Sequence, residues 1–212
     1  TLGGIESYGL KLSSRVLEAG SSVTNSGTIN INGSNGGSNS LSSGIAILED
    51  STMTGASSIR TYTGKVTNAG TINVSGGRGN TGMVLKLDAA DDITNTSSGN
   101  INVRGSHNIG MRVDKGSVNT DASGAPKAIN NGAITLNGGS TETDNIGMVA
   151  NGASVATNNN KITLVGPAKL ATGMLATGNG GTVENASGGN ISGTGLENSI
   201  GISVLSGSTG TN

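Results

Sequence analysis

The chain has no cysteine, tryptophan or phenylalanine, and aromatic residues make up 1% of its 212 residues. The absence of cysteine excludes a disulfide framework and a thiolate metal site. Charged residues make up only 12%, and the formal net charge is −1. Such a chain has no electrostatic field that would attract nucleic acid or an anionic membrane. No apolar run approaches the roughly 20 residues needed to cross a bilayer, so we expect no membrane insertion of this segment.

Glycine, by contrast, is abundant, with 38 residues. A core without large rings must be thin, so that Val, Ile, Leu, Met and Ala can fill it. A composition rich in Gly, Ser, Thr and Asn is also typical of disordered chains. The apolar residues are regularly spaced, however, and a disordered chain has no need of that spacing. We therefore interpret the chain as an ordered repeat protein.

Two phrases alternate along the chain. The first reads VTNSGTINING at 23–33 and VTNAGTINVSG at 66–76, with looser copies at 93–105, 128–138, 156–166 and 183–195. The second is a glycine followed by alternating apolar residues. That glycine stands at Gly9, Gly44, Gly82, Gly110, Gly147, Gly173 and Gly201. Its successive separations are 35, 38, 28, 37, 26 and 28 residues, and periods in this range are typical of solenoids.

Within each unit the apolar residues alternate with a period of two, which predicts strands whose like positions face the same way. Three equivalent positions are apolar throughout the units. The first is held by Leu10, Ile45, Met83, Met111, Met148, Met174 and Ile202, and the second by Val23, Val66, Ile93, Ala128, Ala156 and Val183. The third is held by Ile29, Ile72, Ile101, Ile134, Ile162 and Ile191. The sequence therefore predicts an all-β, right-handed parallel β-helix. It has about six full coils and a partial seventh, three short strands per coil, in a single domain over 1–212. We expect the right hand because the units are long and uneven, unlike the six-residue repeats of left-handed coils.

An asparagine recurs at the end of the second strand of each unit. Its copies are Asn25, Asn68, Asn95, Asn130, Asn158 and Asn185. We predict that they stack as a structural ladder, each amide bonding its equivalents in the neighbouring coils. Two residues later stands Gly27, Gly70 or Gly132, with Asn160 in one copy. Because Gly and Asn both tolerate positive φ, this exchange predicts a corner in the left-handed conformation.

Four insertions lengthen the units, at 34–43, 49–65, 114–127 and 139–145. Those at 49–65 and 114–127, with a shorter acidic one at 88–92, leave the same edge of consecutive coils. Loops on one face of a repeat array often bind partners. We therefore predict a partner-binding edge; the alternative is that the insertions are merely tolerated in solvent. The residues gathered there are Arg60, Tyr62, Lys65, Asp91, Asp92, Asp114 and Lys115.

Signals for catalysis are weak. The one histidine, His107, is interpreted as a turn residue, and the outward Lys86, Arg104 and Arg112 do not align into a catalytic row. The segment 76–80 begins like a calcium-binding nonapeptide but lacks the aspartate ligand and tandem copies. The sequence therefore predicts no catalytic residue, no metal and no cofactor.

The phrase N-x-G-T-I-x-V-x-G, alternating with x-G-M-x-V, resembles the passenger domains of type V (type Va) autotransporters of Gram-negative bacteria, especially large surface adhesins. The resemblance extends from Gly9 to Val204. It implies a secreted, right-handed β-helical stalk on the bacterial surface, anchored in the outer membrane by a C-terminal barrel absent from this segment. Scarcity of cysteine agrees, because such passengers cross the outer membrane unfolded.

The leading hypothesis is a structural and adhesive segment of a longer passenger domain, active in cell adhesion and virulence. Its expected partner is a protein or glycan on a neighbouring or host cell. We expect a monomer whose uncapped ends allow end-to-end stacking. Two alternatives stay open: a β-helical polysaccharide lyase or hydrolase, and a trimeric autotransporter adhesin head with a left-handed coil.

Overall fold

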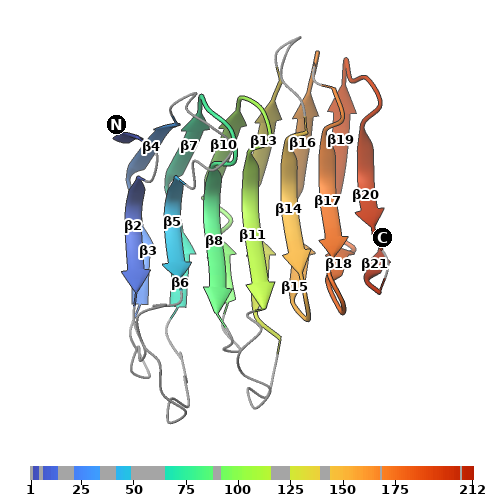
Figure 1. Cartoon of the computed structure of the whole chain (residues 1–212), viewed down its shortest axis with the longest axis horizontal. Helices are drawn as coiled ribbons and strands as arrows, with labels where there is room; N and C mark the ends of the chain where they lie inside the picture. Colours follow the sequence, from blue (N-terminus) through green and yellow to red (C-terminus); the bar gives the residue numbers. More distant parts are fainter. Residues whose placement is uncertain are drawn as a thin grey trace.

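The structure, a computed structural model, describes residues 2–4, 7–13, 22–33, 42–48, 65–87, 92–115, 125–138, 144–167, 169–205 and 207–212. These residues form three parallel sheets of seven strands each. In Figure 1 one sheet faces the viewer with its arrows pointing down, and the strands of another rise behind it as the chain advances to the right. The coil is therefore right-handed. The predicted parallel β-helix, with six full coils and a partial seventh, is confirmed.

We name the sheets A, B and C, and each coil runs through B, C and A in turn. Sheet A contains β1 (Leu2–Gly4), β4 (Thr28–Gly33), β7 (Thr71–Ser75), β10 (Asn100–Arg104), β13 (Ala133–Asn137), β16 (Lys161–Val165) and β19 (Asn190–Thr194). Sheet B contains β2 (Tyr8–Ser13), β5 (Ser43–Leu48), β8 (Thr81–Leu87), β11 (Ile109–Lys115), β14 (Ile146–Asn151), β17 (Thr172–Thr177) and β20 (Ile200–Val204). Sheet C contains β3 (Ser22–Asn25), β6 (Lys65–Asn68), β9 (Asp92–Asn95), β12 (Lys127–Asn130), β15 (Val155–Asn158), β18 (Thr182–Asn185) and β21 (Thr209–Thr211).

The core is a set of columns in which like residues stack between coils. Met83, Met111 and Met148 are adjacent in register on sheet B and have no exposed surface. Ile101 and Ile134 are paired in the same way on sheet A and are equally buried. Each such side chain contributes roughly 1.5–3 kcal/mol of gross burial free energy. Because every coil supplies the same inward set, stability accrues coil by coil.

The recurrent glycine of the second phrase forms a column inside sheet B. A β-carbon on any of its first six members would lie 2.5–2.9 Å from Cγ2 of an isoleucine in sheet A and 2.5–2.6 Å from the carbonyl oxygen of the next glycine. Favourable contacts between carbon atoms need about 3.5–4.0 Å. Glycine recurs here because the sheet A isoleucines occupy the space that a side chain would need. The in–out alternation is interrupted at this point, since both Gly110 and the following Met111 are buried.

One gap in the apolar pattern is filled from elsewhere. Gly193 stands where the other sheet A strands carry an aliphatic side chain, in register with Leu164. Leu196, three residues later, packs its Cδ1 into the space that a Gly193 side chain would occupy. Leu196 is partly buried against the core. The core therefore continues through the sixth coil despite the glycine.

The predicted asparagine ladder is present where sheet C meets sheet A. Nδ2 of each ladder residue donates to Oδ1 of its equivalent in the next coil, at 2.8 Å in all five steps. Asn68, Asn95, Asn130 and Asn158 are fully buried. The amide also reaches a corner carbonyl, for example Gly70 O at 3.2 Å from Asn68 Nδ2. The ladder therefore satisfies polar groups that would otherwise be unpaired inside the coil.

The corner after this ladder does not have the predicted backbone. Neither Gly27, Gly70 and Gly132 nor Asn160 has a positive φ. Glycine is needed at the inner coils for another reason, because a β-carbon on Gly70 would overlap the carbonyl of Gly27 in the coil before it. The prediction of a left-handed corner here is wrong. Close approach of successive backbones explains Gly70 and Gly132, whereas Asn160 carries a β-carbon at the same place in its coil.

A second asparagine ladder, which the sequence reasoning missed, precedes the sheet B strands. Oδ1 of Asn108 accepts from the backbone N–H of Asn80, and Oδ1 of Asn145 accepts from that of Asn108, both at 2.9 Å. All three asparagines are buried. Each stands two residues before a glycine of the column, and this fixed offset is the signal that could have revealed them.

We predict that Gly110→Ala destabilises the fold by about 1–3 kcal/mol, as overpacked cores do. The new β-carbon would lie 2.8 Å from Ile134 Cγ2 and 2.6 Å from the Gly147 carbonyl oxygen. Gly201→Ala is the matched control, because its β-carbon would have no heavy atom within 4 Å. Urea unfolding of both variants tests this, and equal losses would refute the steric explanation.

We predict that Asn130→Ala lowers the free energy of unfolding by about 1–3 kcal/mol, because it leaves buried ladder neighbours without a partner. Asn131→Ala serves as the control. Asn131 belongs to an exposed pair, accepting from Asn159 Nδ2 at 2.8 Å, and its loss should change stability by no more than about 0.5 kcal/mol. Thermal unfolding distinguishes the two, and a neutral Asn130→Ala variant would contradict the structural role of the ladder.

Candidate functional site

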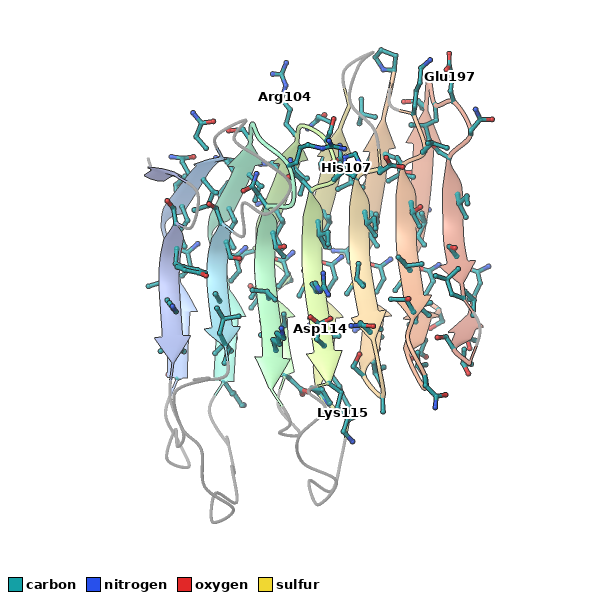
Figure 2. All side chains as sticks on the ribbon, in the orientation of Figure 1. Arg104, His107, Asp114, Lys115 and Glu197 are labelled. Atoms are coloured by element: carbon teal, nitrogen blue, oxygen red, sulfur yellow. The ribbon has the colours of Figure 1, made fainter. Side chains whose placement is uncertain are left out.

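The predicted partner-binding edge lies where the sheet B strands end and the sheet C strands begin, and we call it the BC edge. Of its seven residues, Lys65, Asp92, Asp114 and Lys115 are described, whereas Arg60, Tyr62 and Asp91 lie outside the described residues. Most of the four predicted insertions lie outside them as well. Figure 2 shows Asp114 and Lys115 toward the lower end of β11, whereas His107 and Arg104 lie beyond the upper end of the sheet B strands.

Lys65 and Asp92 are brought side by side. Each is the first residue of its sheet C strand. The residues that follow them, Val66 and Ile93, are paired in register between β6 and β9. Lys127, the first residue of β12, pairs with Asp92 from the other side. A lysine–aspartate–lysine row therefore crosses three coils. Lys127 was absent from the predicted site, although it occupies the same place in its phrase as the other two.

The carboxyl of Asp92 titrates abnormally. Burial raises its pKa above the ordinary value of 3.8, and the positive charge of Lys127 opposes this shift. The folded state therefore favours the protonated carboxyl, so the ionised form destabilises the fold at neutral pH. This penalty is present above the pKa that Asp92 has in the folded state. It disappears as the pH falls from that pKa to below the ordinary value of 3.8.

Asp114 is held by its own strand. Arg112 Nε lies 2.9 Å from both carboxylate oxygens, and the Asp114 side chain is only 7% exposed. In register, Asp114 stands between Lys86 and Asn151 on the outer face of sheet B. Lys115 follows as a half-buried residue at the end of β11. Asp114 is thus paired within sheet B, and Lys65 and Asp92 form a separate group with Lys127 on sheet C.

A second polar cluster lies at the opposite edge, where sheet A strands lead into sheet B, and we call it the AB edge. The third residue before the column glycine has positive φ there in each of five successive coils. These are Gly79, His107, Asp144, Leu170 and Asn198, with φ between 50° and 78°. Left-handed corners therefore occur at the AB edge, where the sequence analysis did not predict them. Histidine, aspartate and asparagine are the residues that tolerate this conformation best after glycine.

His107 lies between charged residues of the neighbouring coils. Its Nε2 is 3.1 Å from Asp144 Oδ2. Arg78 Nη2 is 3.2 Å from Nδ1 and 2.9 Å from Nε2 of the same ring. An atom this close to both ring nitrogens cannot lie in the ring plane without overlapping the carbon between them. Arg78 Nε also donates to Nδ1 at 3.4 Å, so guanidinium N–H groups are directed at the imidazole, while Nε2 faces Asp144.

Further along the AB edge the charges pair with each other. Lys169 and Glu197 form a backbone bridge between successive coils, and Lys169 Nζ lies 2.9 Å from Glu197 Oε2. Within the described part of the chain, no three potential metal-ligating side chains gather closely enough to hold an ion. In the same residues, no helix has the length and apolar character to span a membrane.

Comparison of the chain with protein-family models, with curated proteins and with solved structures gives no match.

Two substitutions of aspartate test the BC edge. Asp92→Asn should stabilise the fold near neutral pH by less than about 1 kcal/mol, since the group is half exposed, and the gain should vanish at about pH 3. Asp114→Asn should destabilise it by about 1–2 kcal/mol, because Arg112 loses a charged acceptor. Thermal unfolding measured across this pH range gives both values. A stabilising Asp114→Asn or a destabilising Asp92→Asn would reverse the assignments.

Proposed function

We propose that this chain is a structural and adhesive segment of an autotransporter passenger on the surface of a Gram-negative bacterium. It acts as a rigid stalk that displays loops to a protein or glycan on a neighbouring or host cell. The observation that carries the proposal is the uninterrupted asparagine ladder, with 2.8 Å bonds through all six full coils. A stack joined at every step can be lengthened by repetition without a new core.

The shape of the stack fits this role. Seven strands per sheet, spaced about 4.8 Å apart, make a column about 30 Å tall. Its outer surface is polar and nearly neutral, with a formal net charge of −1. Such a surface leaves recognition to residues at the edges. We propose the monomer as the functional form, with end-to-end stacking as its mode of self-association.

A polysaccharide lyase or hydrolase is less well supported. Such an enzyme needs charged side chains aimed at a substrate along one sheet. Here Arg112 is paired with Asp114 on sheet B, Lys169 with Glu197, and His107 with Asp144 at the AB edge. The first pair lies on sheet B and the other two at the AB edge, so they do not form one row along a single sheet. The trimeric adhesin head is also disfavoured, because its coil is left-handed and this one turns to the right.

The test compares the purified chain with a variant in which 49–64 is replaced by a two-residue Asn-Gly turn. We expect the intact chain to bind host or neighbouring cells and the trimmed chain to lose binding with unchanged circular dichroism. Absence of binding by both forms would assign the segment a spacing role alone. Both forms are also incubated with uronate polymers. Release of unsaturated or reducing ends would overturn the proposal in favour of the enzyme.

A further inference from the structure

Both ends of the stack leave apolar side chains in contact with water. At the C-terminal end, Ile200 is 48% exposed, Val204 44% and Leu205 51%. They are three of the four large hydrophobic residues exposed within the described part of the chain. At the N-terminal end, Leu10 and Leu12 are only partly buried against the core. Figure 1 shows β2 and β20, which carry these residues, at opposite ends of the stack.

The backbone is open at the same two ends. A β-carbon on Gly173 would lie 2.5 Å from the carbonyl oxygen of Gly201, whereas one on Gly201 would have no heavy atom within 4 Å. β20 and β21 each pair on one side only, with β17 and β18, and β2 and β3 pair only with β5 and β6. The outer side of each of these strands therefore has N–H and C=O groups that no described strand uses. Such edges are templates for pairing with another chain.

The asparagine ladder gives the two ends opposite hydrogen-bonding character. Asn185 Nδ2 donates to Asn212 Oδ1 at 2.8 Å, so the ladder continues into the last coil. Nδ2 of Asn212 then has no acceptor among the described residues. At the other end, Oδ1 of Asn25 accepts only from the backbone N–H of Gly27, at 3.2 Å. One end therefore offers a donor and the other an acceptor, so the two ends of different copies match head to tail and not head to head.

Head-to-tail contact also preserves the register of the sheets. Leu10 and Leu12 begin the two inward columns of sheet B that end at Ile202 and Val204. A second copy placed on the C-terminal end would set its Leu10 against Ile202 and its Leu12 against Val204. Its β3 would lie beside β21 in the same way, and β1 would continue sheet A beyond β19. Each junction between coils inside the stack has this arrangement.

We propose that the C-terminal end of this chain binds the N-terminal end of a second copy. β20 and β21 pair with β2 and β3 of the second copy, and Asn212 Nδ2 donates to Oδ1 of its Asn25. The contact is heterologous, so each added copy leaves a new open end, and association gives open chains rather than a closed dimer. This inference rests on the end-to-end stacking proposed above and names its partner, its direction and its residues.

The experiment measures sedimentation velocity of the purified chain over a range of concentrations. We expect the average sedimentation coefficient to rise steadily with concentration, as open-ended association requires. Val204→Lys should weaken association at least about tenfold, because its ammonium group would be buried unpaired between the two copies. Leu170→Lys is the matched control. Leu170 is 49% exposed but lies at the AB edge of the coil before the last, so association should equal that of the unaltered chain.

A mixture of two variants separates head-to-tail contact from every other kind. Val204→Lys blocks the C-terminal end and Leu12→Lys the N-terminal end, so each alone should be monomeric. Mixed in equal amounts, they should form a dimer that grows no further, because each still has one open end. Circular dichroism verifies that both variants fold, and Val23→Lys replaces Leu12→Lys if that variant does not.

A chain that stays monomeric at every concentration, equal weakening by Leu170→Lys, or a mixture without dimers overturns the inference. Cell binding by the Val204→Lys variant is measured separately. If that variant binds cells as the unaltered chain does, the adhesive function stands whether or not the copies stack. If neither form binds cells while the mixture still dimerises, stacking stands and the adhesive function is rejected.

Discussion

Stacking of like on like, at the spacing of adjacent strands, is the constraint on which the rest of the structure depends. A residue in one coil lies directly against its equivalents in the coils before and after it. The glycine column shows how strict this is, since a β-carbon on Gly110 would meet both the next coil and the Ile134 side chain of the facing sheet. The column glycine of sheet B and the facing isoleucine of sheet A must therefore recur together in each coil, which produces the repeat seen in the sequence.

This constraint explains why so much of the fold could be predicted. Period-two alternation and a repeated phrase indicate strands, and a repeat that aligns with itself indicates parallel sheets. The ladder at Asn130 was predictable because one polar residue recurring among apolar ones must find partners in its neighbours. The conformation of the corner was not predictable. An exchange of glycine for asparagine, as at Asn160, suggests a positive φ, yet this corner has none, and the crowding at Gly70 comes from the backbone of the coil before it.

The candidate site was harder to predict, because insertions hide which edge residues share a column. His107 and Asp144 align only when each is counted back three residues from its column glycine, across an insertion, and Arg78 stands one residue earlier in its own coil, in register with Ser106. Asp114 seemed free at the end of its strand, yet Arg112 stands two residues earlier, on the same face, and neutralises it. That pairing follows from strand periodicity and was available from the sequence alone.

Edges are also where such a fold can change without losing its core. Inward positions are restricted by the stacked neighbours, and ladder asparagines by the coils on both sides. A corner residue such as His107 only has to adopt the local positive φ and fit beside the neighbouring side chains at the edge. Charge can therefore vary from coil to coil along the AB edge, from Arg78 through Asp144 to the Lys169–Glu197 pair, while the hydrogen-bonded interior repeats unchanged. A column built in this way separates the positions that stabilise the stack from the edge positions that can vary, and an edge residue can change while the stacked interior stays the same.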